Sequence, residues 1–345
     1  MESGSVELIL VGPYPPPAGG MAHHTEALFR LARAEGIGAV VLDINKNEAK
    51  GVVPVSGRTD LFTKVRGSDA EIVHVHADSF DLHYHAPAAI AAANLSRKKT
   101  VLSIHSGDAA DYYERASAFR RALIRFSLSR ADAIVADNSR IADFARHAGA
   151  KGKVLVLSPF FAEAVEFEKL PSGLASFAEG SKPLFVACGN PSPVYRLGKV
   201  IGAFAAIIKE RPSAGLVITR TDADDEAGWA KLQERVKEPG LEGRVRIESG
   251  LSHGQFLALL RCADAFVRFT THDGDSLSVR EALSAGTCTI ASDTGTRPDG
   301  VVLVESGDER SLAEAMSSAQ RPIEPTSPED VREEFVRLYG ELLGK

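Results

Sequence analysis

The stretch HDGDSLSVREALSAG, residues 272–286, carries three acidic side chains whose spacing supports two different chemistries. Asp273 and Asp275 form an Asp-x-Asp pair, and two carboxylates in that arrangement can hold a divalent metal ion against a diphosphate. Asp273 and Glu281 are instead separated by seven residues, which can place one acid on a loop and the other on the helix that follows. The choice between the two pairs decides whether the site uses a metal ion.

The helix expected after this loop gives Glu281 a position from which it can bind a ligand. The helical pattern stops at Gly286, so Glu281 falls about one turn into the helix. The backbone N–H groups of Gly274 to Leu277 precede the first turn, where they can face a ligand. The two oxygens of a carboxylate can accept bonds from both hydroxyls of a ribose. The alternative is structural: Ser276 caps the helix and the acids only suit its first turn.

Two further loops follow apolar runs that are typical of strands. Gly19 and Gly20 come directly before an amphipathic helical pattern, where free backbone N–H groups and the helix dipole suit an anion. Simple turn geometry explains the same pair. His105 closes the run KTVLSIHSG and can hydrogen-bond either a ligand hydroxyl or a backbone carbonyl in a structural role.

A cluster of histidines raises the question of a zinc site. The residues concerned are His74, His76, His83 and His85. No His-Glu-x-x-His spacing or supporting cysteine accompanies them, so we expect no metal site. The three cysteines, Cys188, Cys262 and Cys288, are isolated in apolar segments and are expected to be small buried side chains in a reducing compartment.

Short apolar runs alternate with helical patterns along the chain, as in parallel β-α-β units. The rhythm breaks in the Gly-, Ser- and Pro-containing segment 162–183 and then restarts. We therefore predict an α/β protein with two Rossmann-like doubly wound domains, residues 1–165 and 166–325, and a shared cleft as the binding site. Residues 326–345 are predicted to form a helix that packs across the domains.

The charge of the chain bounds its partners. A formal net charge of -6 does not fit a nucleic-acid backbone, so we expect no nucleic-acid partner. The segment Tyr112–Arg130 is locally basic, either as a solvated helix face or as a surface for anionic lipid head groups between Arg115 and Arg130. No window reaches the roughly 18 apolar residues of a membrane span. We therefore expect a cytoplasmic protein, which can at most rest on the inner face of a membrane.

These features together resemble the GT-B glycosyltransferases, specifically the large retaining family 4 group. That family carries an acid-x7-acid motif, usually Glu-Gly-Phe-Gly-Leu followed by a Leu-Glu-Ala helix. Here the sequence reads DGDSL at 273–277 and REA at 280–282, followed by SAGTCTIASDTG. The Gly-Gly loop at 19–20, the His-Ser-Gly at 105–107 and the run ADAIVADNS extend the resemblance over essentially the whole chain.

The resemblance implies transfer of a sugar from a nucleotide-sugar, a UDP- or GDP-sugar, with retention of anomeric configuration and without a metal or another cofactor. By this resemblance Glu281 binds the donor ribose, and Asp273 with the N–H groups of Gly274, Asp275 and Ser276 holds the sugar hydroxyls. Gly19 and Gly20 approach the diphosphate, Leu277 and Ser278 offer backbone donors near the phosphates, and His105 reaches toward the transferred sugar. Preplaced N–H groups and cations stabilise the leaving nucleoside diphosphate.

The sequence departs from the family pattern at the diphosphate. The family usually places an Arg and a Lys after the first strand of the C-terminal domain, at positions that correspond here to Asn190 and Tyr195. Arg196, Lys199 or Arg297 can replace the missing charges. The chain is thus predicted to be a retaining glycosyltransferase that acts on a glycan or lipid-linked acceptor, in surface polysaccharide or glycolipid synthesis. A non-catalytic relative that binds a sugar nucleotide or glycan is the alternative.

Overall fold

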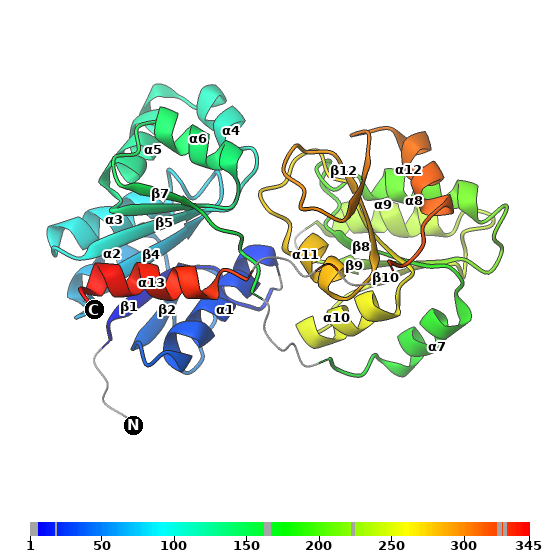
Figure 1. The fold of residues 1–345 in the computed structure, drawn as a ribbon, viewed down its shortest axis with the longest axis horizontal. Helices are drawn as coiled ribbons and strands as arrows, with labels where there is room; N and C mark the ends of the chain where they lie inside the picture. Colours follow the sequence, from blue (N-terminus) through cyan, green and yellow to red (C-terminus); the bar gives the residue numbers. More distant parts are fainter. Residues whose placement is uncertain (1–5, 18, 162–166, 222–224, 323–325, 327–329) are drawn as a thin grey trace. The chain divides into compact units, whose positions relative to one another are not determined.

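The apolar runs of the sequence form two separate parallel sheets, which belong to two units of the chain (Figure 1). The computed structural model describes residues 6–17, 19–161, 167–221, 225–322, 326 and 330–345. One unit comprises Met1–Phe161 with Asp330–Lys345, and the other comprises Ala162–Glu329. The predicted α/β fold with two doubly wound domains is confirmed.

The first unit contains a seven-stranded sheet in the order β3-β2-β1-β4-β5-β6-β7, with parallel neighbours throughout. Its strands are β1 (Leu8–Gly12), β2 (Ala39–Asp43), β3 (Val52–Pro54), β4 (Ile72–Ala77), β5 (Lys99–Ile104), β6 (Ala133–Ala136) and β7 (Lys153–Val156). Its helices are α1 (Gly20–Ala34), α2 (Arg58–Gly67), α3 (His85–Leu95), α4 (Ala109–Arg115), α5 (Ala118–Arg130), α6 (Ser139–His147) and α13 (Arg332–Leu343).

The second unit contains a six-stranded parallel sheet in the order β10-β9-β8-β11-β12-β13. Its strands are β8 (Leu184–Gly189), β9 (Gly215–Arg220), β10 (Val245–Glu248), β11 (Ala265–Arg268), β12 (Cys288–Ser292) and β13 (Val301–Val304). Its helices are α7 (Ser172–Gly180), α8 (Leu197–Ile207), α9 (Glu226–Val236), α10 (His253–Cys262), α11 (Leu277–Ser284) and α12 (Glu309–Ser317). The strand order reverses between β8 and β11, so the loops after these two strands border a switch point, the usual ligand site of such sheets.

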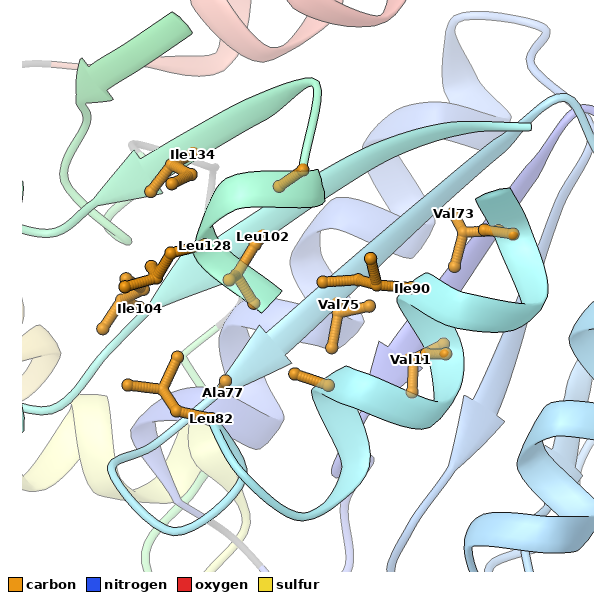
Figure 2. Packing of buried hydrophobic residues seen from close by; sticks show 14 of the residues in the cluster. Val11, Val73, Val75, Ala77, Leu82, Ile90, Leu102, Ile104, Leu128 and Ile134 are labelled. Carbon is orange, nitrogen blue, oxygen red and sulfur yellow. The ribbon is translucent and has the colours of Figure 1, made fainter. Parts of the chain in front are cut away.

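Side-chain alternation along β4 separates a core from a polar network. Val73, Val75 and Ala77 point to one face, where they pack in a single buried cluster with residues of α3, such as Ile90 (Figure 2). His74 and His76 alternate with them and therefore point to the opposite face. The same strand thus builds the core and carries two buried histidines.

The structure differs from the expectations at segment 162–183 and at Cys262. The predicted boundary between residues 165 and 166 lies outside the described residues, and the units separate after Phe161. Segment 162–183, taken as a break in the rhythm, contains helix α7, whose Leu174 and Ala178 join a core of the second unit. Cys262 is exposed because it lies on the outer side of α10 at its last turn.

Helix α13 belongs to the first unit, whereas the sequence placed it across both domains. Its buried residues Phe335, Leu338 and Tyr339 join one cluster with residues of β1 and α1, such as Leu10 and Leu28. Their spacing forms one apolar stripe, and this cluster buries that stripe. Within the described residues no helix combines the length and the apolar character that crossing a membrane requires.

The substitution Phe335→Ala tests this placement. Phe335 is fully buried, so its truncation should lower the free energy of unfolding of the first unit by about 3–5 kcal/mol. The chain has one tryptophan, Trp229, which lies in α9 of the second unit, so its fluorescence follows the second unit. Circular dichroism should show a lower urea midpoint for the unfolding of the first unit. The urea midpoint of the Trp229 fluorescence transition should be unchanged. The exposed neighbour Arg337→Ala is the control; a shift confined to the Trp229 transition would contradict the assignment.

Candidate functional site

The loop after strand β11 gathers two arginines around one carboxylate. Arg268 ends β11 and donates from Nε to Oδ2 of Asp273 at 3.1 Å and from Nη2 to Oδ1 at 2.7 Å. Arg297, from the loop after β12, donates from Nη1 to the same Oδ2 at 2.7 Å. The Thr270 hydroxyl donates to that oxygen at 2.8 Å. Both carboxylate oxygens of Asp273 are therefore engaged within the protein.

Burial and charge act in opposite directions on this cluster. Burial by itself raises the pKa of the Asp273 carboxyl, but the guanidinium groups of Arg268 and Arg297, together with the Thr270 hydroxyl, lower it by more, so the net shift is downward. Burial likewise lowers the pKa of Arg268, and the Asp273 carboxylate more than reverses that effect. The three side chains thus bring two positive charges and one negative charge together, a net charge of +1.

The two aspartates of the Asp-x-Asp pair face different partners. Asp275 accepts from Nε of Arg280 with both oxygens, at 2.8 and 2.6 Å, while Asp273 is held by Arg268 and Arg297. Each carboxylate therefore has its own guanidinium partner. The role of Asp273 at the sugar hydroxyls stays a prediction; its contacts show that it also anchors two arginines.

The N-terminus of helix α11 comes directly after the loop that carries Asp273 and Asp275. Gly274, Asp275 and Ser276 are buried, and Ser276 is the residue before the helix. Its side chain makes no capping bond among the described residues; its hydroxyl instead lies 3.2 Å from the Ser278 hydroxyl. The capping role considered for Ser276 is therefore wrong. Leu277 and Ser278 supply the first backbone N–H groups of the helix, which no preceding turn can satisfy.

Glu281 lies in the second turn of α11 and is buried. Its Oε1 lies 2.6 Å from Nε2 of His253. His253 is the first residue of α10, which starts with a reciprocal capping box between Ser252 and Gln255. The start of α10 thus fixes the imidazole that faces Glu281.

The loop after β8 closes over the end of that strand. Gly189 has a φ of 156°, and a Cβ at this position would lie 2.2 Å from the Tyr195 ring, so only glycine permits the fold of this loop. Asn190 accepts from the Ser192 backbone N–H at 3.0 Å. The guanidinium of Arg268 lies over the Tyr195 ring, 4.7 Å from its centroid. Tyr195, one of the two positions without the family's charges, therefore lies beside an arginine from the neighbouring strand.

The three cations suggested as replacements lie in two different places. Arg297 is in the Asp273 cluster. Arg196 donates to the Ser306 hydroxyl at 3.0 Å, and Lys199 donates to the Gly307 carbonyl at 2.6 Å. These two side chains line a pocket of about 490 Å³ between the N-terminal part of α8 and helix α9. The structure thus joins Arg297 to Asp273 but directs Arg196 and Lys199 to the loop after β13.

In the first unit, the glycine pair lies where the sequence predicts. Gly19 is the residue before helix α1, with extended backbone, and Gly20 is the first helical residue. Among the described residues no atom lies within 4 Å of a Cβ built on Gly19. The start of α1 therefore has space for an approaching group at this glycine.

His105 follows strand β5 and is held on both ring nitrogens. Its Nδ1 lies 3.0 Å from Oδ1 of Asp137, and its Nε2 lies 3.0 Å from Nδ1 of His76. A carboxylate accepts, so Nδ1 of His105 carries the proton and its Nε2 accepts from His76. Asp137 thereby fixes the tautomer and the orientation of His105.

A third imidazole joins this pair. Nδ1 of His24 lies 2.9 Å from the Pro159 carbonyl, which can only accept, so this nitrogen donates. Ring nitrogens of His24, His76 and His105 lie within 4.8 Å of one another, and this is the trio among the described residues that can hold a metal ion. Nε2 of His76 is buried and has no hydrogen-bond partner in the part of the chain that the structure describes. Of the four histidines that the sequence offered as a zinc cluster, His76 belongs to this trio, whereas His83 and His85 face Tyr112 and Asp81.

The buried histidines are neutral because charging them inside the protein is unfavourable. Burial lowers the pKa of His74 to about 3, with a further contribution from His105. Burial and neighbouring imidazoles lower the pKa values of His24 and His76 well below the usual range. His74 is bonded at 2.7 Å to the Ser103 hydroxyl and at 2.8 Å to the Tyr339 hydroxyl of α13. These bonds link the terminal helix to strands β4 and β5.

Sequence reasoning missed several members of these clusters. Arg268 is a charged residue at the end of an otherwise apolar strand, and that position was its signal. Asp137 follows β6 directly, and the carboxyl end of a strand was likewise its signal. His24 and His253 gave no comparable signal, because each lies in a helix whose neighbours only the fold determines.

Comparison with known proteins gives a matching assignment to each unit. Residues 5–159 match the family described as glycosyl transferase 4-like domain, and residues 182–321 match the family described as glycosyl transferases group 1. The GDP-mannose:cellobiosyl-diphosphopolyprenol alpha-mannosyltransferase of Xanthomonas campestris is 27% identical over 246 residues, which are 69% of this chain and 60% of the relative. Its namesake in Xanthomonas oryzae pv. oryzae is 26% identical over 65% of this chain and 56% of the relative. The chain therefore matches less than two thirds of the length of either relative.

Solved structures share the fold. Sucrose-phosphate synthase from Thermosynechococcus elongatus superposes with a TM-score of 0.75 at 14% identity, covering 98% of this chain and 99% of that chain. HepE of Anabaena in complex with UDP and glucose gives a TM-score of 0.69 at 14% identity, covering 90% of this chain and 89% of that chain. The predicted GT-B fold is confirmed.

The buried histidines predict that acid destabilises the first unit. Their rings are neutral in the folded chain and take up a proton near pH 6.5 when unfolded. The unfolded state therefore binds more protons below about pH 6.5, and the free energy of unfolding should fall by about 1.4 kcal/mol per pH unit for each histidine. Urea unfolding followed by circular dichroism between about pH 7 and pH 5 measures this slope.

The variant His74→Gln provides the control for this slope. It removes one of the titrating rings. The free energy of unfolding of the variant should therefore depend less steeply on pH than that of the unchanged chain, by the contribution of one histidine. The Trp229 transition reports the second unit and should change less over this range. Equal slopes for the variant and the unchanged chain would show that His74 is not buried as a neutral ring.

Proposed function

Because the chain belongs to the family of glycosyl transferases group 1, we propose that it is a retaining glycosyltransferase that moves a sugar from a nucleotide-sugar to a lipid-linked glycan acceptor. Surface polysaccharide or glycolipid synthesis is the corresponding process. The observation that carries the proposal is the position of Glu281, buried in the helix after β11 and paired with His253 at 2.6 Å. From that position its carboxylate can accept the hydroxyls of a donor ribose.

The leaving nucleoside diphosphate needs positive charge and N–H donors as the glycosidic bond breaks. The N-terminus of α11 supplies backbone donors at Leu277 and Ser278, and the Asp273 cluster supplies arginine side chains. With these groups the diphosphate requires no bridging metal ion, so we propose a metal-independent reaction. The roles of Gly19 and Gly20 at the diphosphate, and of His105 at the transferred sugar, remain predictions from the resemblance.

The acceptor proposal rests on a relative and on one surface of the first unit. The Xanthomonas relatives carry a diphosphopolyprenol acceptor in their names. On helix α5, Phe119 is 71% exposed, and three arginines of the same helix, Arg120, Arg121 and Arg125, are exposed as well. A helix that exposes both an aromatic ring and cations suits the surface of an anionic membrane. We therefore propose that α5 brings the protein to the inner face of the membrane, where a lipid-linked acceptor is available.

A pocket beside α5 supports the same acceptor. Its volume is about 420 Å³, and it combines one cation with aromatic and apolar side chains. The lining residues are Arg58, Thr59, Phe62, His83, Tyr84, Pro87, Ala88 and Leu123. Arg58 lies over the Tyr84 ring at 4.8 Å from its centroid. Such a pocket can receive a phosphate together with the start of an apolar chain.

Incubation with a panel of UDP-, GDP- and ADP-sugars tests the transferase. GDP-mannose is the first donor to try, because the Xanthomonas relatives are named for it. We expect release of nucleoside diphosphate that increases when a polyprenyl-diphosphate glycan is added. Glu281→Ala should lower kcat/KM by about 10- to 100-fold, since it removes bonds to the ribose. The exposed Glu314→Ala is the matched control.

Two outcomes of this experiment would change the proposal. Tight nucleotide binding without turnover, with acceptor present, would show the alternative, a non-catalytic sugar-nucleotide or glycan-binding relative. Activity should also survive EDTA. A strict need for manganese or magnesium would instead return the metal role to the Asp273–Asp275 pair.

Vesicle binding tests helix α5. Reversing charge at Arg120, Arg121 and Arg125 should weaken binding to phosphatidylglycerol vesicles by about 1 kcal/mol or more per residue and leave phosphatidylcholine vesicles unaffected. Reversal at Lys182, Lys209 and Lys237, exposed on the second unit, is the control. Equal binding by both triple variants would show that α5 is only a solvated face.

A further inference from the structure

The chain lacks the side-chain charges that its family places after the first strand of the C-terminal domain. Asn190 and Tyr195 occupy the two positions, and neither carries a positive charge. Of the nearby candidates, Arg196 and Lys199 are bonded to the loop after β13. A diphosphate leaving group still requires neutralisation, so the charge has to come from elsewhere.

Arg268 reaches the same place from the adjacent strand. Strands β8 and β11 are parallel neighbours, with Val267 paired to Ala187. The Arg268 guanidinium lies 4.7 Å from the Tyr195 ring centroid, and its Nη1 lies 3.5 Å from the Cys188 carbonyl. A charge on β11 is therefore presented beside the loop after β8, at the position from which the family's lysine is missing.

The surrounding contacts fix one edge of Arg268 and leave the other weakly bonded. Nε and Nη2 are held by the two oxygens of Asp273. Within the described residues, the contacts of Nη1 are long, at 3.5 Å to the Cys188 carbonyl and 3.8 Å to its sulfur. Arg297 also pairs with Asp273, so two guanidinium groups share one carboxylate and the cluster has a net charge of +1. A phosphate oxygen would make a shorter bond to Nη1 and balance that charge.

We propose that Arg268 binds the diphosphate of the donor in place of the family's Arg and Lys, and that Asp273 and Arg297 position its guanidinium. The inference rests on the proposed transferase function and identifies the cation of its donor site. It also explains why an aspartate replaces the family's longer glutamate at position 273. The Asp273 carboxylate is bonded to Arg268, which ends the strand just before it. Arg297, only 3% exposed, acts through Asp273.

Nucleotide binding to the full-length chain tests the proposal, with GDP and UDP as probes and guanosine and uridine as neutral comparisons. Arg268→Gln should raise the Kd of the nucleoside diphosphate about 10- to 100-fold and leave the Kd of the neutral nucleoside unchanged. Arg246→Gln is the matched control, because Arg246 also pairs with a carboxylate and lies over an aromatic ring, but on β10. Trp229 fluorescence reports whether each variant is folded.

A double variant that relocates the positive side chain provides a second test. Arg268→Leu combined with Tyr195→Lys moves the cation back to the family's position, and it should restore diphosphate binding to within about 10-fold of the unchanged chain. Should Arg268→Gln fail to fold, this double variant carries the test. Folded Arg268→Gln with unchanged diphosphate affinity, or a folded double variant whose affinity stays lower by more than that factor, would overturn the proposal.

The result is separable from the proposed function. If the unchanged chain binds neither GDP nor UDP and releases no nucleotide from any sugar nucleotide, the transferase proposal fails. If it binds the diphosphates and Arg268→Gln binds them equally well, the function stands and the assignment of Arg268 is wrong.

Discussion

One buried carboxylate, Asp273, organises the candidate site of the second unit. It holds Arg268 through two bonds and Arg297 through a third, so charges from the ends of β11 and β12 are brought together on one side chain. Two guanidinium groups cannot be buried side by side without a carboxylate between them, because each would lose its hydration without compensation. The Tyr195 ring packs against one of these arginines, Arg268, and helix α11 starts four residues after Asp273.

The first unit buries a cluster of imidazole side chains instead of an arginine–aspartate cluster. His24, His74, His76 and His105 lie in contact on one face of its sheet, and burial lowers the pKa values of His24, His74 and His76 so that these three rings are neutral. Asp137 orients His105, and the Tyr339 hydroxyl of the terminal helix bonds to His74. The C-terminal helix is therefore part of the polar network of the first unit as well as of its core. The two units place different chemistry at their sheet edges: an ionic cluster with net positive charge in one and a cluster of imidazoles in the other.

The fold was predictable from the sequence because it depends on local patterns repeated many times. Apolar strands such as Val73–Ala77 alternate with helical segments, and each repeat independently indicates a parallel β-α-β unit. Glu281 was placed correctly in its helix for the same reason, since its position follows from the spacing to Asp273 and the stop at Gly286. The unit to which α13 belongs was not predictable, because one apolar stripe fits many surfaces and only the three-dimensional arrangement selects among them.

The sequence by itself determined the two-domain α/β architecture, the family resemblance and the loops that carry the acids and the glycine pair. Only the tertiary structure decided which charges meet. Arg268 and Tyr195 are far apart along the chain, as are His253 and Glu281, and each pair is joined because parallel strands bring their carboxyl ends to one edge of a sheet. Side-chain pairing of this kind depends on distances of a few ångströms between distant segments. Residue order contains no direct record of those distances, whereas the periodicity that builds each strand and helix is written in neighbouring residues.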